Sequence, residues 1–144
     1  MPVDTAEQTV QVDAPFETVI ETLRDVESQA EWIPEIRAAE VLEVDDSGMP
    51  ATASFKAAAP VGTDEYTLAY EHRPNGMSWT MIRGRLQTGQ EGDYAVHQLA
   101  HDRSAVTYRL TIHHNLPLPG FVRKRVITGL VASTLRGLKE RVES

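Results

Sequence analysis

Hydrophobic and polar positions alternate at the start of the chain. The segment Thr5–Asp13 shows a loose twofold period, which predicts a first strand with Val10 and Val12 on one face. The sequence Asp13-Ala14-Pro15 then predicts the start of a helix, because aspartate can cap a helix and proline suits its first turn. A short amphipathic helix is expected after it, since apolar residues recur at helical spacing: Phe16, Val19, Ile20 and Leu23.

A second short helix is predicted over Glu27–Trp32, ended by Pro34, because the residue before a proline avoids the helical region. From Ile36 onward the period becomes twofold and stays so as far as His114. Turn sequences rich in Gly, Pro, Asn and Asp divide this stretch into six predicted strands: 36–45, 50–59, 62–72, 77–85, 88–99 and 103–114. Because the connections are short, we expect an antiparallel meander.

The last predicted strand has the clearest pattern, with its apolar residues on one face: Val106, Tyr108, Leu110 and Ile112. A long helix is then expected over residues 119–142, with a continuous apolar stripe: Ile127, Leu130, Val131, Thr134, Leu135, Leu138 and Val142. Such a stripe needs an apolar sheet surface to pack against. The element order therefore predicts a twisted antiparallel sheet that curls around the last helix.

This order, together with a succession of short motifs, resembles the START/Bet v 1-like (SRPBCC) superfamily and, within it, the bacterial polyketide cyclase/dehydrase-like group. The motifs span nearly the whole chain: VQVDAPF at 10–16, WIPEI at 32–36, EVLE at 40–43, Ser78-Trp79, EGDY at 91–94, VTYRL at 106–110 and LRGLKERV at 135–142. The resemblance implies an α+β helix-grip fold, with seven antiparallel strands around a long C-terminal helix and two short helices after strand 1. It also implies one ligand-binding domain over residues 1–144.

A cavity between the concave face of the sheet and the long helix is what this fold implies. Strand alternation, and for Trp32 the expected position near the entrance, gives the candidate ligand-binding residues: Trp32, Phe55, Tyr66, Tyr70, Trp79, Met81, Arg83, Tyr94, Tyr108 and His114. The competing interpretation is that the aromatic side chains simply fill the core.

Arg83 shares its alternation with Trp79 and Met81, so we expect it to point inward. A buried guanidinium is costly unless it is paired. A ligand carboxylate, phosphate or enolate oxygen would satisfy it, as would Glu43, or solvent at the strand end. If the protein is a cyclase, Arg83 and an inward tyrosine would polarise a polyketide carbonyl, and His114 would be the base. The alternative for His114 is an exposed position at the rim.

Charge and composition limit the partners. The chain has 144 residues, a formal net charge of −7 and no cysteine, so Cys-based zinc sites and thiolate nucleophiles are excluded. Six basic and two acidic side chains fall within residues 118–144, and we expect at least two of Arg123, Lys124 and Arg125 to face solvent. We expect no nucleic-acid partner, no integral membrane segment, no signal peptide, a cytoplasmic location, and a monomer or homodimer.

Three functions remain open at this point. The first is the binding of a small hydrophobic ligand, such as a lipid, an isoprenoid or a polyketide. The second is a cofactor-independent polyketide aromatase/cyclase or dehydratase, and the third is a protein-interaction module. Neither a metal nor a cofactor is expected, because His97 and His101 lie too far apart on a strand to share one ion and no nucleotide-binding motif is present.

Overall fold

Seven strands follow one another along the chain, with the short helices between the first and the second and a long helix at the end. The computed structural model describes residues 2–144. Its elements are β1 (Val3–Val12), α1 (Phe16–Arg24), a 3₁₀ turn (Val26–Ser28), α2 (Gln29–Trp32), β2 (Ile36–Val44), β3 (Pro50–Ala59), β4 (Gly62–Arg73), β5 (Gly76–Gly84), β6 (Gln87–Ala100), β7 (Arg103–His114) and α3 (Gly120–Glu143).

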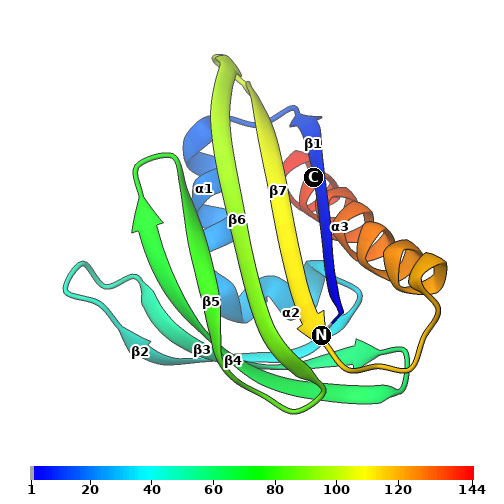
Figure 1. Cartoon of the computed structure of the whole chain (residues 1–144). Helices are drawn as coiled ribbons and strands as arrows, with labels where there is room; N and C mark the ends of the chain where they lie inside the picture. Colours follow the sequence, from blue (N-terminus) through cyan, green and yellow to red (C-terminus); the bar gives the residue numbers. More distant parts are fainter. Residues whose placement is uncertain (1) are drawn as a thin grey trace.

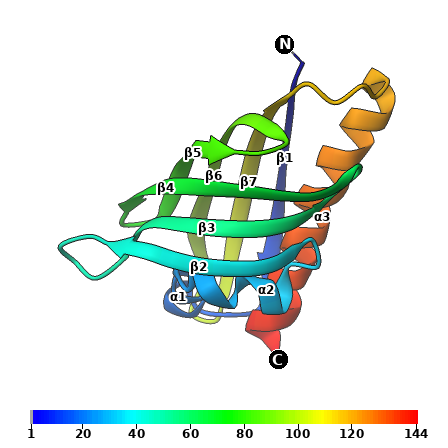
Figure 2. The same cartoon turned by 90° about the horizontal axis from the view of Figure 1, so that it is seen from below.

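The seven strands form one antiparallel sheet in the order β1-β7-β6-β5-β4-β3-β2. The sheet bends strongly, so that β2 and β3 run across β6 and β7, and α3 lies along the open side (Figures 1 and 2). The chain therefore adopts the helix-grip fold, and the predicted α+β architecture is confirmed.

The two faces of the sheet differ as strand alternation requires. On the concave face of β7, Val106, Tyr108 and Leu110 are buried against the apolar stripe of α3. On the convex face, threonine hydroxyls bond across β1 and β7, with Thr5 and Thr111 oxygens 2.9 Å apart. This division places the core, and any cavity in it, between the sheet and α3.

Two β-bulges flank the β5–β6 turn, and each reverses the alternation of its strand. In the β4–β5 ladder Leu68 pairs with Met81 and Thr67 with Arg83, so Ile82 is the extra residue. Thr67 belongs to the outer face, and Arg83 is therefore exposed there. The prediction that Arg83 points into the cavity is wrong, because it assumes that side chains keep alternating between the two faces past Ile82.

The start of α1 also differs from expectation. Pro15 is the N-cap residue, and no side chain caps the helix. Asp13 instead donates its backbone N–H to a carboxylate oxygen of Glu143 at 2.8 Å, which ties the end of β1 to the end of α3.

Trp32 lies against the C-terminal half of α3 at Gly137. A Cβ added to Gly137 would collide with the backbone carbonyl oxygen of Trp32, so only glycine permits this approach. The indole of Trp32 is buried, as its size leads one to expect. Its expected place at the cavity entrance is wrong, because this contact holds it beside the far end of the helix.

Candidate functional site

A cavity of about 140 Å³ lies between the concave face of the sheet and the N-terminal half of α3. Side chains from β3 to β7 form one wall, and Ile127, Leu130 and Thr134 of α3 form the other. Its exposed lining residues are Ala58, Pro60 and Val126. The opening therefore lies between the β3–β4 turn and the beginning of α3, which approach each other in Figure 2.

Aromatic rings make a continuous floor on the sheet side of the cavity. The rings of Tyr94 and Tyr108 have centroids 4.6 Å apart, and Trp79 lies 5.1 Å from Tyr94 and 6.0 Å from Tyr70. Trp79 is paired with Gly92 on β6, where a Cβ would collide with the indole, so the ring lies across the glycine. Because neighbouring rings contact one another, this floor suits a flat or chain-like apolar body.

The four tyrosine hydroxyl groups sit in a dry environment. Burial raises the pKa of Tyr66, Tyr70, Tyr94 and Tyr108 well above the ordinary value of 10.0, and a nearby carboxylate or the neighbouring phenols raise each further. Within residues 2–144, no hydrogen bond is made by the hydroxyl of Tyr66 or of Tyr70. Both side chains keep 9% exposure and line the cavity, so their neutral hydroxyls are available to a ligand.

A chain of polar side chains closes one end of the floor. Trp79 donates its Nε1–H to Gln90 at 2.8 Å, and the Gln90 amide donates to Gln87 at 2.8 Å. Gln87 in turn donates to Asp64 at 3.0 Å, and the N–H of Leu86 donates to the other Asp64 oxygen at 2.8 Å. These bonds fix the β5–β6 turn over β4 and orient the indole of Trp79.

A second polar cluster joins β1, β7 and α3. His114 lies 2.8 Å from Asp4, and Arg123 donates to the same carboxylate oxygen at 3.3 Å. The N–H of Leu116 donates to Nδ1 of His114, so the ring proton is on Nε2 and is donated to Asp4. Both ring nitrogens are thus occupied. The interpretation of His114 as an exposed rim residue is wrong, since only 4% of it is exposed, and as it stands it offers no free nitrogen to a substrate.

Glu35 brings a carboxylate to the cavity from the loop after α2. One oxygen accepts a hydrogen bond from Ser133 of α3 at 2.8 Å. Its charge is close enough to Tyr108 to contribute to the raised pKa of that phenol, after burial and the neighbouring tyrosines. The second oxygen of Glu35 has no hydrogen-bond partner in the part of the chain that the structure describes.

Seven of the ten side chains expected at a ligand site line this one cavity: Phe55, Tyr66, Tyr70, Trp79, Tyr94, Tyr108 and His114. Trp32, Met81 and Arg83 do not. Met81 points inward but its thioether lies over Gly84, outside the lining. The polar lining residues Asp4, Gln29, Glu35, Asp64, Gln87, Gln90 and Arg123 were not expected.

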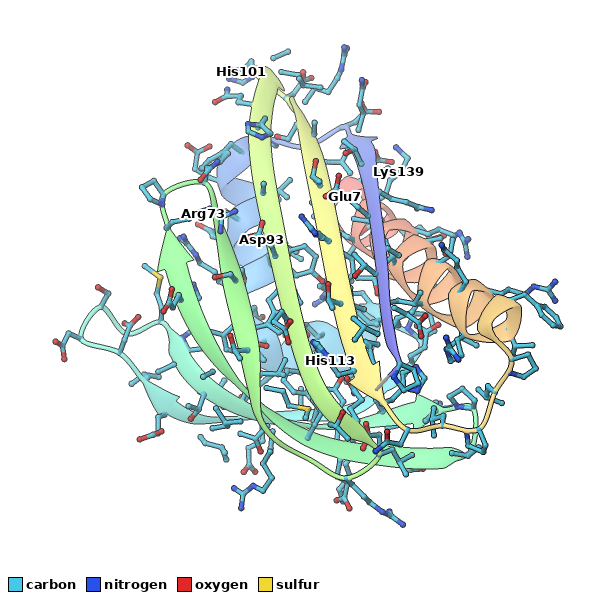
Figure 3. The ribbon with its side chains drawn as sticks, in the orientation of Figure 1. Glu7, Arg73, Asp93, His101, His113 and Lys139 are labelled. Atoms are coloured by element: carbon cyan, nitrogen blue, oxygen red, sulfur yellow. The ribbon has the colours of Figure 1, made fainter. Side chains whose placement is uncertain are left out.

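Two further pairs of polar side chains lie on the convex face, away from the cavity. Arg73 makes two hydrogen bonds of 2.8 Å to Asp93, and His113 lies 3.0 Å from Glu91 (Figure 3). Lys124 and Arg125 face solvent, as expected, whereas Arg123 is half-buried. Across residues 2–144, no three His, Asp or Glu side chains are grouped so that they could hold a metal ion.

Comparison with known proteins identifies the family. The model of the family described as polyketide cyclase/dehydrase and lipid transport matches residues 4–143. The chain belongs to this family. Among curated proteins, none matches.

Solved structures similar to this member of the polyketide cyclase/dehydrase and lipid transport family share its fold. A START superfamily protein from Mycobacterium smegmatis has a TM-score of 0.90 at 23% identity, covering 96% of this chain and 97% of that chain. The ZhuI aromatase/cyclase from Streptomyces sp. R1128 has a TM-score of 0.82 at 16% identity, covering 99% and 94%. At these identities the likeness concerns the fold.

No helix among the described residues is long and apolar enough to cross a bilayer.

Proposed function

We propose that the protein binds a small hydrophobic ligand in the cavity between the sheet and α3. The observation that carries this proposal is the aromatic floor: packed rings make an apolar surface, while the hydroxyls of Tyr66 and Tyr70 have no partner within the described part of the chain. Natural ligand sites combine a mostly apolar lining with a few polar groups in this way. The family description, which includes lipid transport, supports the same conclusion.

The size of the cavity indicates how such a ligand is held. A volume of about 140 Å³ is close to that of the ~150 Å³ engineered cavity that accepts benzene. The enclosed part of the cavity therefore accommodates a single ring or a short chain segment. A longer molecule extends through the opening beside Pro60 and Val126, or displaces the loop before α3.

Native mass spectrometry of the purified protein tests the proposal directly. We expect a bound small molecule that is released on denaturation and is soluble in organic solvent. The variant Leu130→Trp places a bulky ring in the cavity and should lose the adduct, whereas Thr128→Trp, on the exposed side of α3, should keep it. An adduct that survives equally in the variant Leu130→Trp contradicts binding in this cavity.

The second candidate function is cofactor-independent cyclisation or dehydration of a polyketide. It is favoured by the family description and by the fold shared with an aromatase/cyclase. Glu35 would be the base that removes an acidic α-proton, because it lines the cavity and its second oxygen has no hydrogen-bond partner among residues 2–144, while both nitrogens of His114 are occupied. Turnover of a poly-β-ketone by the wild type, lost in Glu35→Gln, would favour this function over binding alone.

A further inference from the structure

The charges that face the cavity are unbalanced. Three carboxylates line it, from Asp4, Glu35 and Asp64, against one guanidinium, from Arg123. Arg123 is committed to Asp4 at 3.3 Å and to the carbonyl oxygen of Leu118 at 3.2 Å. The cation thus neutralises one acid, and among residues 2–144 the other two carboxylates of the lining are left without a countercharge.

No cationic side chain within residues 2–144 is paired with Glu35 or Asp64. In this part of the chain Asp64 accepts only from an amide side chain and a backbone N–H, and Glu35 only from the hydroxyl of Ser133. Ionised carboxylates in a site of low dielectric repel a second negative charge strongly, since little solvent screens them. The buried phenols bring no positive charge to offset this, although their neutral hydroxyls remain hydrogen-bond donors.

From this charge pattern we infer that the cavity selects neutral, hydroxyl-bearing hydrophobic ligands and excludes carboxylates and phosphates, with Glu35 as the residue that sets this preference. The inference deepens the proposed binding function and rests on it. A ligand hydroxyl can donate to the free oxygen of Glu35, and the hydroxyls of Tyr66 and Tyr70 can donate to a ligand oxygen elsewhere in the cavity. A fatty acid carboxylate would instead meet the two carboxylates of Glu35 and Asp64, and the guanidinium of Arg123 is already paired with Asp4.

Cationic ligands fit the site less well than alcohols do. An ammonium group recognised by aromatic residues lies over an open ring face, within about 6 Å of the ring centroid. Here the rings of Trp79, Tyr94 and Tyr108 are tilted against one another with centroids 4.6 to 6.0 Å apart, so each covers part of its neighbour's face. Removing an ammonium from water to pair with Glu35 costs about as much as the pairing returns.

Isothermal titration calorimetry at neutral pH with three probes of one carbon skeleton tests the inference: geraniol, geranate and geranylamine. We expect geraniol to bind, geranate to bind at least about tenfold more weakly, and geranylamine to bind no more tightly than geraniol. Equal or tighter binding of geranate or tighter binding of geranylamine would overturn the inference and leave the binding function standing. Failure of all three to bind would contradict the binding function and the inference with it.

A pair of variants isolates the role of Glu35. Glu35→Gln removes the charge but keeps an oxygen that accepts from Ser133, so the fold should be preserved. We expect geranate affinity to rise about tenfold while geraniol affinity changes less than about threefold. Glu40→Gln makes the same change in net charge on an exposed position of β2 outside the cavity and should alter neither. If the ratio of geraniol affinity to geranate affinity is unchanged in Glu35→Gln, a group other than Glu35 sets the preference for neutral ligands.

Discussion

Four phenols buried along one cavity wall make the stability of the protein sensitive to alkaline pH. Each has its pKa raised above 10.0, and the largest cause in every case is burial. In the unfolded chain the same side chains ionise at their ordinary value. Above pH 10 the folded state therefore holds more protons than the unfolded state, and the free energy of unfolding falls as pH rises.

The melting temperature should accordingly fall with rising pH above about 10, and phenolate absorbance should appear together with unfolding. Circular dichroism and ultraviolet absorbance, recorded on the same samples, measure the two signals. Tyr70→Phe removes one of the titrating groups and should make the decline shallower. Phenolate absorbance from all four tyrosines near pH 10 in protein that is still folded would contradict the burial argument.

Arg83 provides a test of the corrected strand alternation. Because its side chain is exposed on the convex face, Arg83→Met should change the free energy of unfolding by less than about 0.5 kcal/mol and leave ligand affinity unchanged. Gln90→Leu, which removes the acceptor of the Trp79 indole, should instead destabilise the protein by about 1–3 kcal/mol. Urea denaturation and calorimetry compare the two. Weakened ligand binding in Arg83→Met would place the guanidinium at the site after all.

At the scale of the elements, two glycines on α3 differ in what surrounds them. Gly137→Ala should destabilise the protein by about 1–3 kcal/mol, because the new Cβ would collide with the carbonyl oxygen of Trp32 and separate α2 from α3. Gly129→Ala meets nothing within 4 Å and should stabilise the helix by up to about 1 kcal/mol. Thermal unfolding distinguishes them. Similar melting temperatures for the two variants would show that the α2–α3 contact is dispensable.

Strand and helix positions were predictable because period and turn chemistry change where the elements change. The seven strands and the long helix lie within a few residues of their expected bounds. In the structure Asp4, Asp64 and Gln90 share parity with Val12, Tyr66 and Tyr94 and lie on the inner face. Parity alone does not mark them as lining residues, because carboxylate and amide side chains are usually exposed.

Other features of the site depend on tertiary structure and left no local signal. The bulges at Ile82 and Thr88 turn Arg83 outward and Gln87 inward, and neither bulge is marked by a turn sequence of its own. Glu35 lies in a loop, where no period applies. Its position depends on a hydrogen bond to Ser133, which is 98 residues away in the sequence.

At the scale of the whole molecule, the position of α3 against the sheet depends on contacts between the two ends of the chain. Asp4 of β1 holds His114 of β7 and Arg123 of α3, and His114 in turn holds the N–H of Leu116 in the loop that borders the cavity. This cluster joins the edge strand to the start of the long helix. Loss of its carboxylate should loosen the loop and the helix start together.

Asp4→Ala should reduce the free energy of unfolding by about 1–3 kcal/mol, because a buried histidine and an arginine lose their acceptor. Hydrogen exchange should accelerate at Leu116 and in the first turn of α3. Glu7→Ala, on the outer face of the same strand (Figure 3), should leave exchange in this region unchanged. Unchanged exchange at Leu116 in Asp4→Ala would show that the loop is held by other contacts.

Because Trp79 stacks across Gly92, the residues tolerated at these two positions should depend on each other. Any side chain at residue 92 collides with the indole, and the obstacle is a side chain, unlike the backbone carbonyl that blocks Gly137. In a library randomised at both positions, larger residues at 92 should survive selection for folding only beside smaller residues at 79. Such exchanges would shift side-chain volume from β5 to β6. They would change the shape of the cavity floor without altering the pairing of the strands.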